Sequence, residues 1–101
     1  MGKAENKIES AVNEYAEKNG FLVRKYTSPN VIGVPDDIYF GHGLVFLIEF
    51  KSPKGVLTRA QKDEIQRIRR HGCKVFIVDT IEHGKSIFDC AMWTETLYVD
   101  S

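Results

Sequence analysis

The sequence predicts a single α/β domain in which a mixed central β-sheet is flanked by helices. The first observation behind this prediction is length, because 101 residues suffice for one modest hydrophobic core and not for two. The second is the order of the apolar patterns, which alternate between helical spacing and short β-rich runs as α-β-β-β-α-β. Since the last strand follows a crossover helix, it should pair in parallel with the strand before that helix.

Each element is predicted from its spacing and its end signals. Helices are assigned where apolar residues recur every three or four positions, and strands where β-branched and aromatic residues run between turn residues. The segment Gly41-His42-Gly43 is a predicted hairpin, so the strands on either side of it should be antiparallel neighbours. The predicted elements are helix 4–19, strands 21–26, 37–40 and 44–51, helix 58–71, strand 74–79, a short helix over 85–93 and an extended segment over 96–99.

Composition and charge narrow the possible classes of protein. Lys and Arg together number 14, as do Asp and Glu, so any nucleic-acid binding must come from a local patch and not from a global field. Cys73 and Cys90 lack C-x-x-C spacing and are predicted to be buried free thiols in a reducing compartment. No apolar stretch approaches the roughly 20 residues needed to cross a bilayer, and the N-terminus has no signal-peptide pattern. The sequence therefore predicts an intracellular protein with no membrane partner.

The strand over residues 44–51 ends in two charged residues that do not suit a core strand. Glu49 and Lys51 are two positions apart, so the period-2 rule places both side chains on one face. Burying an unpaired charge costs at least several kcal/mol, so the two residues are either paired or used. Asp36 opens the preceding strand and should meet Glu49 across the hairpin, at the same end of the sheet. From spacing alone, a surface ion pair between Glu49 and Lys51 is an equal alternative.

These side chains fit metal-assisted hydrolysis of a phosphodiester. Carboxylates at one edge of a sheet are the ligands that Mg²⁺ or Mn²⁺ prefers, with water completing the octahedron. A cation held there lowers the pKa of a bound water, and Lys51 would orient or deprotonate that water or stabilise the transition state. Glu9, on the predicted first helix, is a further candidate, although a solvated helix charge is the more common role for such a residue.

Four segments occur in order along the chain: Glu9, Gly33-Val-Pro-Asp36, Glu49-Phe-Lys51 and Gln61. In these segments the chain resembles the VRR-NUC nucleases, a branch of the PD-(D/E)XK superfamily, over about residues 5–79. The resemblance implies a PD-(D/E)XK nuclease core with the element order α-β-β-β-α-β. Asp37, an extra acid after the motif aspartate, departs from the pattern. Strand alternation sends Asp36 and Asp37 to opposite faces, and Asp36 is the favoured ligand.

Specific roles for the site residues follow from the resemblance. It implies that Mg²⁺ or Mn²⁺ is held by Asp36, Glu49 and the backbone carbonyl of Phe50, with Glu9 reaching the metal through water. Lys51 would be the catalytic lysine. Gln61 would be the active-site glutamine, although Thr58-Arg-Ala-Gln61 also reads as a capping box at the start of a helix.

The resemblance also implies an activity and its partners. The expected function is that of a divalent-metal-dependent DNA endonuclease acting on branched DNA such as Holliday junctions, with no organic cofactor. Small members of the family occur in phages and bacteria and resemble Holliday-junction resolvases in forming dimers, so a homodimer in the cytoplasm of a bacterium or an infected host is expected. The alternative is a non-catalytic nucleic-acid-binding or assembly module that retains the nuclease fold.

The remaining candidates concern DNA contacts and the C-terminus. Five polar or basic residues are predicted to contact DNA, with a plain strand and turn or a solvated helix face as the alternative; they are Lys25, Ser28, Lys54, Arg59 and Lys62. The domain is expected to span residues 1–101, with 80–101 as a C-terminal extension of the sheet or a dimer contact. Trp93 is expected in the core or in that contact, not as a base-stacking platform.

Overall fold

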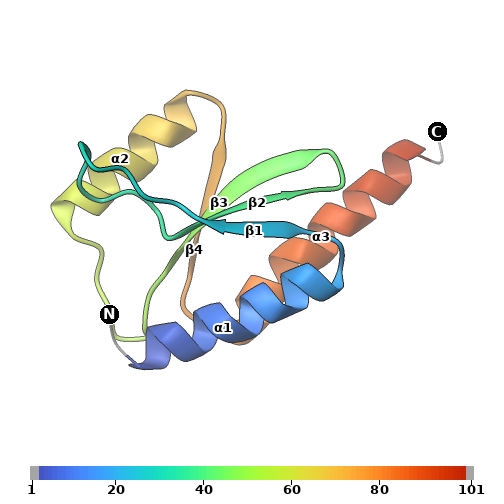
Figure 1. The fold of residues 1–101 in the computed structure, drawn as a ribbon, viewed down its shortest axis with the longest axis horizontal. Coiled ribbons are helices and arrows are strands. Elements are labelled where there is room, and N and C mark those ends of the chain that lie inside the picture. The colour runs from blue at the N-terminus through green and yellow to red at the C-terminus, as the bar shows by residue number, and fades with distance from the viewer. Residues whose placement is uncertain (1–2, 100–101) are drawn as a thin grey trace.

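The computed structural model describes residues 3–99. Its helices and strands follow one another in the predicted order (Figure 1). The elements are α1 (Lys3–Lys18), β1 (Leu22–Lys25), β2 (Asp37–Gly41), β3 (Leu44–Phe50), α2 (Arg59–Arg70), β4 (Lys74–Val78) and α3 (Ile81–Val99). The α/β class and the α-β-β-β-α-β core are therefore confirmed. Through residue 79, the predicted boundaries differ from the observed ones by no more than one or two residues, which is the usual uncertainty at element ends.

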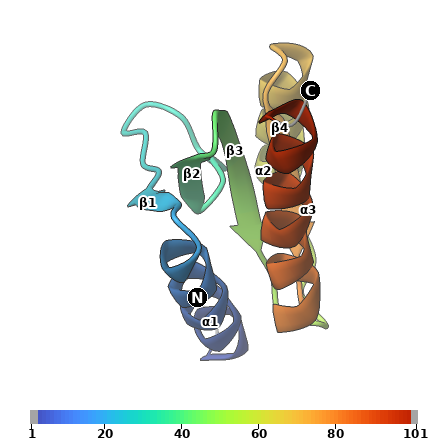
Figure 2. The ribbon, with the colours of Figure 1, turned by 90° about the vertical axis from the view of Figure 1, so that its right-hand side faces the viewer.

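The four described strands form one mixed sheet in the order β1-β2-β3-β4. The first three pair antiparallel, and β4 joins β3 in parallel after the α2 crossover, as predicted. The β2–β3 hairpin has a two-residue loop in which His42 and Gly43 both have positive φ, 53° and 79°. This is the backbone of a type I′ turn, whose twist matches that of the paired strands. Figure 2 shows β1 and α1 on one side of the molecule, and β4, α2 and α3 on the other.

The alternation of side chains along β3 divides the core into two layers. Phe46, Ile48 and Phe50 belong to the larger core, which α1 and α3 cover. Leu47 points to the opposite face and packs with Ile65 of α2. Glu49 and Lys51 continue the alternation on the side of Leu47, which faces α2. The opposite face of β3 is anchored in the larger core by its apolar side chains.

The C-terminal part of the chain differs from the prediction. Residues 96–99 are helical and not extended, because α3 continues from Ile81 to Val99. The described part of segment 80–101 therefore does not extend the sheet. The helix also begins earlier than predicted, because the Thr80 side chain accepts a hydrogen bond from the His83 backbone N–H at 3.1 Å and caps the first turn.

The burial predicted for the two cysteines is wrong, and of the two places expected for Trp93 the core is excluded. Cys73 is partly exposed and Cys90 is exposed, so neither thiol is buried. Trp93 is 65% exposed and lies outside the core. By contrast, α3 does pack on α1, where Gly84 leaves no room for a Cβ atom beside Val12. Within residues 3–99, no helix combines the length and the apolar character that a membrane span requires.

Candidate active site

Asp36 is fixed at the end of β3 by backbone hydrogen bonds. Its N–H donates to the carbonyl of Ile48 at 3.1 Å, and its Oδ2 accepts the N–H of Phe50 at 2.8 Å. Burial raises the pKa of Asp36, and the Phe50 hydrogen bond opposes that rise. The hairpin thus brings Asp36 beside Glu49, as the strand pairing predicts.

Glu49 is a buried carboxylate with one oxygen engaged and one oxygen bare. It is 2% exposed. Its Oε2 accepts a hydrogen bond from Gln61 Nε2 at 3.1 Å and lies 3.8 Å from Lys51 Nζ. Among the described residues, its buried Oε1 has no hydrogen-bond partner. Burial, followed by the charge of Asp36, raises the pKa of Glu49 to about 8, although Lys51 opposes the shift. We call Asp36, Glu49, Lys51 and Gln61 the carboxylate site.

Gln61 combines a role in capping α2 with a contact to the Glu49 carboxylate. As the third residue of α2, it completes a capping box, since its Oε1 accepts the Thr58 N–H at 2.9 Å and its own N–H donates to Thr58 Oγ1 at 3.1 Å. The other end of the same amide donates to Glu49. The cap therefore holds the glutamine in the orientation that reaches the carboxylate, and the two roles do not compete.

Gly33, in the Gly33-Val-Pro-Asp36 motif, packs directly on the start of α2. Its φ is +90°, and a Cβ there would lie 2.6 Å from the carbonyl carbon of Ala60 and 2.7 Å from the Gln61 nitrogen. A side chain would therefore push the loop that carries Asp36 away from the helix that carries Gln61. The glycine sets the spacing between two parts of the carboxylate site.

We expect Gly33→Ala to destabilise the protein by about 2–4 kcal/mol, because strain from positive φ and a backbone collision add. Gly72→Ala is the matched control, since Gly72 has the same φ of +90° but a Cβ added there would meet nothing within 4 Å. That control should cost only about 1 kcal/mol. Urea unfolding of both variants measures the difference. Equal losses would show that the contact with α2 does not constrain the loop.

Asp37 lies on the opposite face of the sheet from Asp36, as strand alternation predicts. It is 1% exposed and faces α1, where Asn13 Nδ2 donates to its Oδ2 at 3.0 Å. The Tyr39 hydroxyl donates to Asn13 Oδ1 at 2.6 Å and lies 3.4 Å from the same Asp37 oxygen. Asp37 is thus held within a buried polar group and does not face Glu49.

Glu9 points from α1 toward Lys25, with Oε2 2.5 Å from Nζ. Burial, followed by a hydrogen-bonding contact with Asp37, raises the pKa of Glu9 to about 7, while Lys25 opposes the rise. Glu5, one turn earlier on α1, is a residue that the sequence motifs miss: its charge raises the pKa of both Asp36 and Glu49. The i,i+4 spacing of two acids on one helix face was the available signal.

The donor set at the carboxylate site fits a hard divalent cation. Two carboxylates, one with a bare buried oxygen, are the oxygen ligands that Mg²⁺ or Mn²⁺ takes. Within residues 3–99, no group of three or more His, Cys, Asp or Glu side chains is arranged to hold a metal by itself. A cation held by Asp36 and Glu49 would therefore need further oxygen ligands. Water and the backbone carbonyl of Phe50, the residue after Glu49, are the candidates.

Of the predicted DNA-contacting residues, Lys25 is the last residue of β1, and the other four lie on loops or on the first turns of α2. Lys54, Arg59 and Lys62 are exposed, and Arg59 pairs with Asp63 at 3.3 Å along α2. Ser28 is half-buried in the β1–β2 loop. Exposed pairs of this kind contribute little to stability, so these side chains can exchange partners at low cost.

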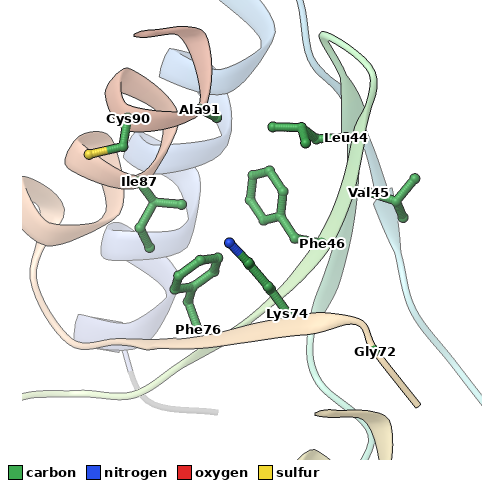
Figure 3. A pocket seen from close by; sticks show the side chains of 9 residues that line it. All are labelled: Leu44, Val45, Phe46, Gly72, Lys74, Phe76, Ile87, Cys90 and Ala91. Carbon is green, nitrogen blue, oxygen red and sulfur yellow. The ribbon is translucent and has the colours of Figure 1, made fainter. Parts of the chain in front are cut away.

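A separate cavity of about 330 Å³ opens at the other end of β3 and β4 (Figure 3). Phe46, Phe76 and Ile87 point toward one another in it, with the Lys74 ammonium between them. Its described lining contains none of the predicted site residues. The cavity therefore plays no part in the chemistry assigned to the carboxylate site.

The four-stranded mixed sheet, the three helices and the carboxylate–lysine end of β3 define a nuclease-type α/β protein. The model of the VRR-NUC domain family matches residues 4–80, and the chain belongs to that family. A solved structure described as a VRR_NUC domain is similar to it with a TM-score of 0.79 and 24% identity, over 87% of this chain and 97% of that one. A second, described as a VRR_NUC domain protein, has a TM-score of 0.72 and 17% identity, over 90% and 89% of the two chains. No curated protein sequence matches the chain.

Proposed function

We propose that the protein is a Mg²⁺- or Mn²⁺-dependent DNA endonuclease that hydrolyses phosphodiester bonds in branched DNA such as Holliday junctions. One observation carries the proposal: Asp36, Lys51 and Gln61 converge on Glu49, whose Oε1 is buried and without a hydrogen-bond partner among the described residues. Leaving such an oxygen unpaired costs stability, which is typical of a site that a ligand completes. Membership of the VRR-NUC family supports the nuclease class.

Each residue has a definite task in this proposal. Asp36, Glu49 and the Phe50 carbonyl would hold the cation, which supplies an activated water and neutralises charge on the phosphate. Gln61 orients the Glu49 carboxylate, since its amide is fixed by the cap of α2. The Lys51 ammonium, 15% exposed and 3.8 Å from Glu49, would orient the attacking water or stabilise charge on the phosphate in the transition state.

Other residues serve the same reaction from the margins of the site. Glu9 would contact the cation through water, with Glu5 adding negative charge at the same edge. The exposed Lys54, Arg59 and Lys62 follow β3 along the chain and would track the DNA backbone. Since net charge at pH 7 is zero, this local group of basic residues must supply the attraction for DNA.

We further propose that the active form is a homodimer. A domain of 101 residues offers little surface to hold a four-way junction, and a two-fold axis would bring two carboxylate sites to two strands. Light scattering coupled to size-exclusion chromatography measures the mass directly. A monomer at the concentration used for cleavage would contradict this part of the proposal.

Incubation of the purified protein with a panel of linear, nicked, flap and four-way-junction DNAs tests the activity. We expect cleavage in Mg²⁺ or Mn²⁺, none in EDTA, and faster cleavage of the branched substrates. Binding of DNA without cleavage in either metal would instead indicate a non-catalytic module. Equal rates on all substrates would contradict the preference for branched DNA and leave the endonuclease assignment standing.

A further inference from the structure

A group of polar side chains, partly buried and partly exposed, lies on the α1 side of the sheet, next to the carboxylate site. It contains Asp37 and Tyr39 from β2, Asn13 and Glu9 from α1, and Lys25 from β1. Hydrogen bonds run from the Tyr39 hydroxyl to Asn13 Oδ1 at 2.6 Å, and from Asn13 Nδ2 to Asp37 Oδ2 at 3.0 Å. Asn13 thus links Asp37 to α1 through a hydrogen bond. We call these five residues the Lys25 cluster.

The Lys25 ammonium forms ion pairs with two buried acids, Glu9 and Asp37. It lies directly opposite Asp37 in the β1–β2 register, with Nζ 3.7 Å from Asp37 Oδ1 and 2.5 Å from Glu9 Oε2. The lysine side chain is 63% exposed, whereas those of Glu9 and Asp37 are 10% and 1% exposed. The acids cannot move into solvent, so they fix the position of an ammonium that solvent can reach.

The charge balance is unusual for a purely structural ion pair. Burial opposes the charge on Lys25, but the hydrogen bond that its ammonium donates to Glu9 and the charges of Asp37, Glu9 and Asp36 outweigh that effect, and the pKa of Lys25 is raised. One acid would suffice to pair a surface lysine, and a second buried acid adds a desolvation cost. Lys25 also lies near the edge of the carboxylate site, because it pairs with Asp37 in the sheet and the N–H of the next residue, Tyr26, donates to the Asp36 carbonyl at 2.9 Å.

We propose that Asp37 is a positioning residue, which with Asn13 and Tyr39 fixes the Lys25 ammonium beside the carboxylate site so that it binds a phosphate of the DNA strand. This inference rests on the proposed endonuclease function and extends it. A long lysine side chain normally loses rotamer freedom when it binds a phosphate, and a lysine that is already held loses less. Asp37, the extra acid after the motif aspartate, would thereby contribute to substrate binding.

The direction in which Asp37→Asn changes the affinity for DNA distinguishes a positioning role from a purely electrostatic one. Removing a carboxylate near a DNA phosphate should tighten binding if Asp37 acts only as a charge. If Asp37 positions Lys25, Asp37→Asn should instead weaken binding by about threefold to tenfold, because the lysine is released. Glu14→Gln is the matched control: it removes one acid from α1 whose side chain is 72% exposed and paired with Lys18. The control should leave binding equal or slightly tighter.

Binding would be measured by fluorescence anisotropy on a junction DNA in Ca²⁺, over a series of salt concentrations. Lys25→Gln should lower the slope of log affinity against log salt by about one, as expected for one lost phosphate contact. In cleavage assays, Asp37→Asn should raise KM more than it lowers kcat. Thermal unfolding of each variant checks that the fold persists, and Asp37→Asn retains a side chain of the same shape toward Asn13.

Two failures can be told apart. If wild-type protein binds junction DNA but Asp37→Asn binds it as tightly or more tightly, the positioning role is wrong and the proposed function stands. If wild-type protein binds none of the DNAs, the proposed function fails, and the phosphate contact of Lys25 fails with it. An unchanged salt slope in Lys25→Gln would likewise exclude the phosphate contact.

Discussion

Cleavage of DNA is expected to fall by about a thousandfold or more in each of the variants Asp36→Asn, Glu49→Gln and Lys51→Ala. The two amides remove a ligand charge from the proposed cation, and the alanine removes the ammonium 3.8 Å from Glu49. Initial rates on junction DNA at saturating Mg²⁺ measure the effect. A variant of the three that cut at the wild-type rate would show that its residue has been wrongly assigned.

Glu64→Gln provides a control matched for burial. Glu64 is a carboxylate of α2, one turn after Gln61, that is 9% exposed and accepts a hydrogen bond from Arg67 at 2.8 Å. Its amide variant should cleave within about twofold of the wild-type rate. A large loss there would mean that the assay reports general damage to the fold.

Metal binding separates the ligands from the lysine. Calorimetric titration with Mn²⁺ should show a site in wild-type protein and in Lys51→Ala, and a much weaker one in Asp36→Asn and Glu49→Gln. This readout does not depend on turnover. If none of the variants changed Mn²⁺ binding, the metal would bind elsewhere in the protein. If wild-type protein bound no Mn²⁺, it would behave as expected of a non-catalytic module.

The fold was largely predictable because local patterns and tertiary packing agree over most of the chain. The exception is the end of α3, where Thr96, Leu97, Tyr98 and Val99 have the composition of a strand. Their local preference for extended backbone is weaker than the gain from propagating an existing helix by one hydrogen bond per residue. The Thr80 cap that starts this helix was visible in the sequence as a threonine before a helical segment.

The carboxylate site was predictable only in part, because some of its contacts are purely tertiary. Strand alternation correctly separates Asp36 from Asp37, and the hairpin brings Asp36 to Glu49. Spacing could not show that one amide serves both the α2 cap and Glu49. Nor could it show that Lys25 lies against Glu9, since that contact depends on how α1 crosses β1.

Metal-free protein is expected to lose stability as pH rises from about 4.5 to about 8, the ordinary and the folded-state pKa of Glu49. Over this range the unfolded chain gives up a proton that the folded protein retains, so the free energy of unfolding falls. Glu9, with a folded-state pKa of about 7, contributes in the same direction up to that pH. Below the ordinary pKa both states are protonated and the full stability is present.

Glu49→Gln should therefore unfold at a higher temperature than wild type at about pH 8 in EDTA, and at nearly the same temperature at about pH 5. The amide resembles the neutral acid in shape and can keep the contact with Gln61, so little is lost where the wild-type carboxyl is protonated. The expected gain at the higher pH is on the order of a few kcal/mol, measured by urea unfolding at a series of pH values.

Added Mn²⁺ should reverse the order of the two proteins at the higher pH. A cation binds the ionised carboxylate and stabilises the folded state by mass action, and Glu49→Gln cannot benefit in the same way. Wild-type protein should thus gain more from Mn²⁺ at about pH 8 than at about pH 5, because the proton on Glu49 competes with the metal. If Glu49→Gln matched the wild-type stability at every pH in EDTA, the buried carboxylate would not carry the cost that its bare oxygen implies.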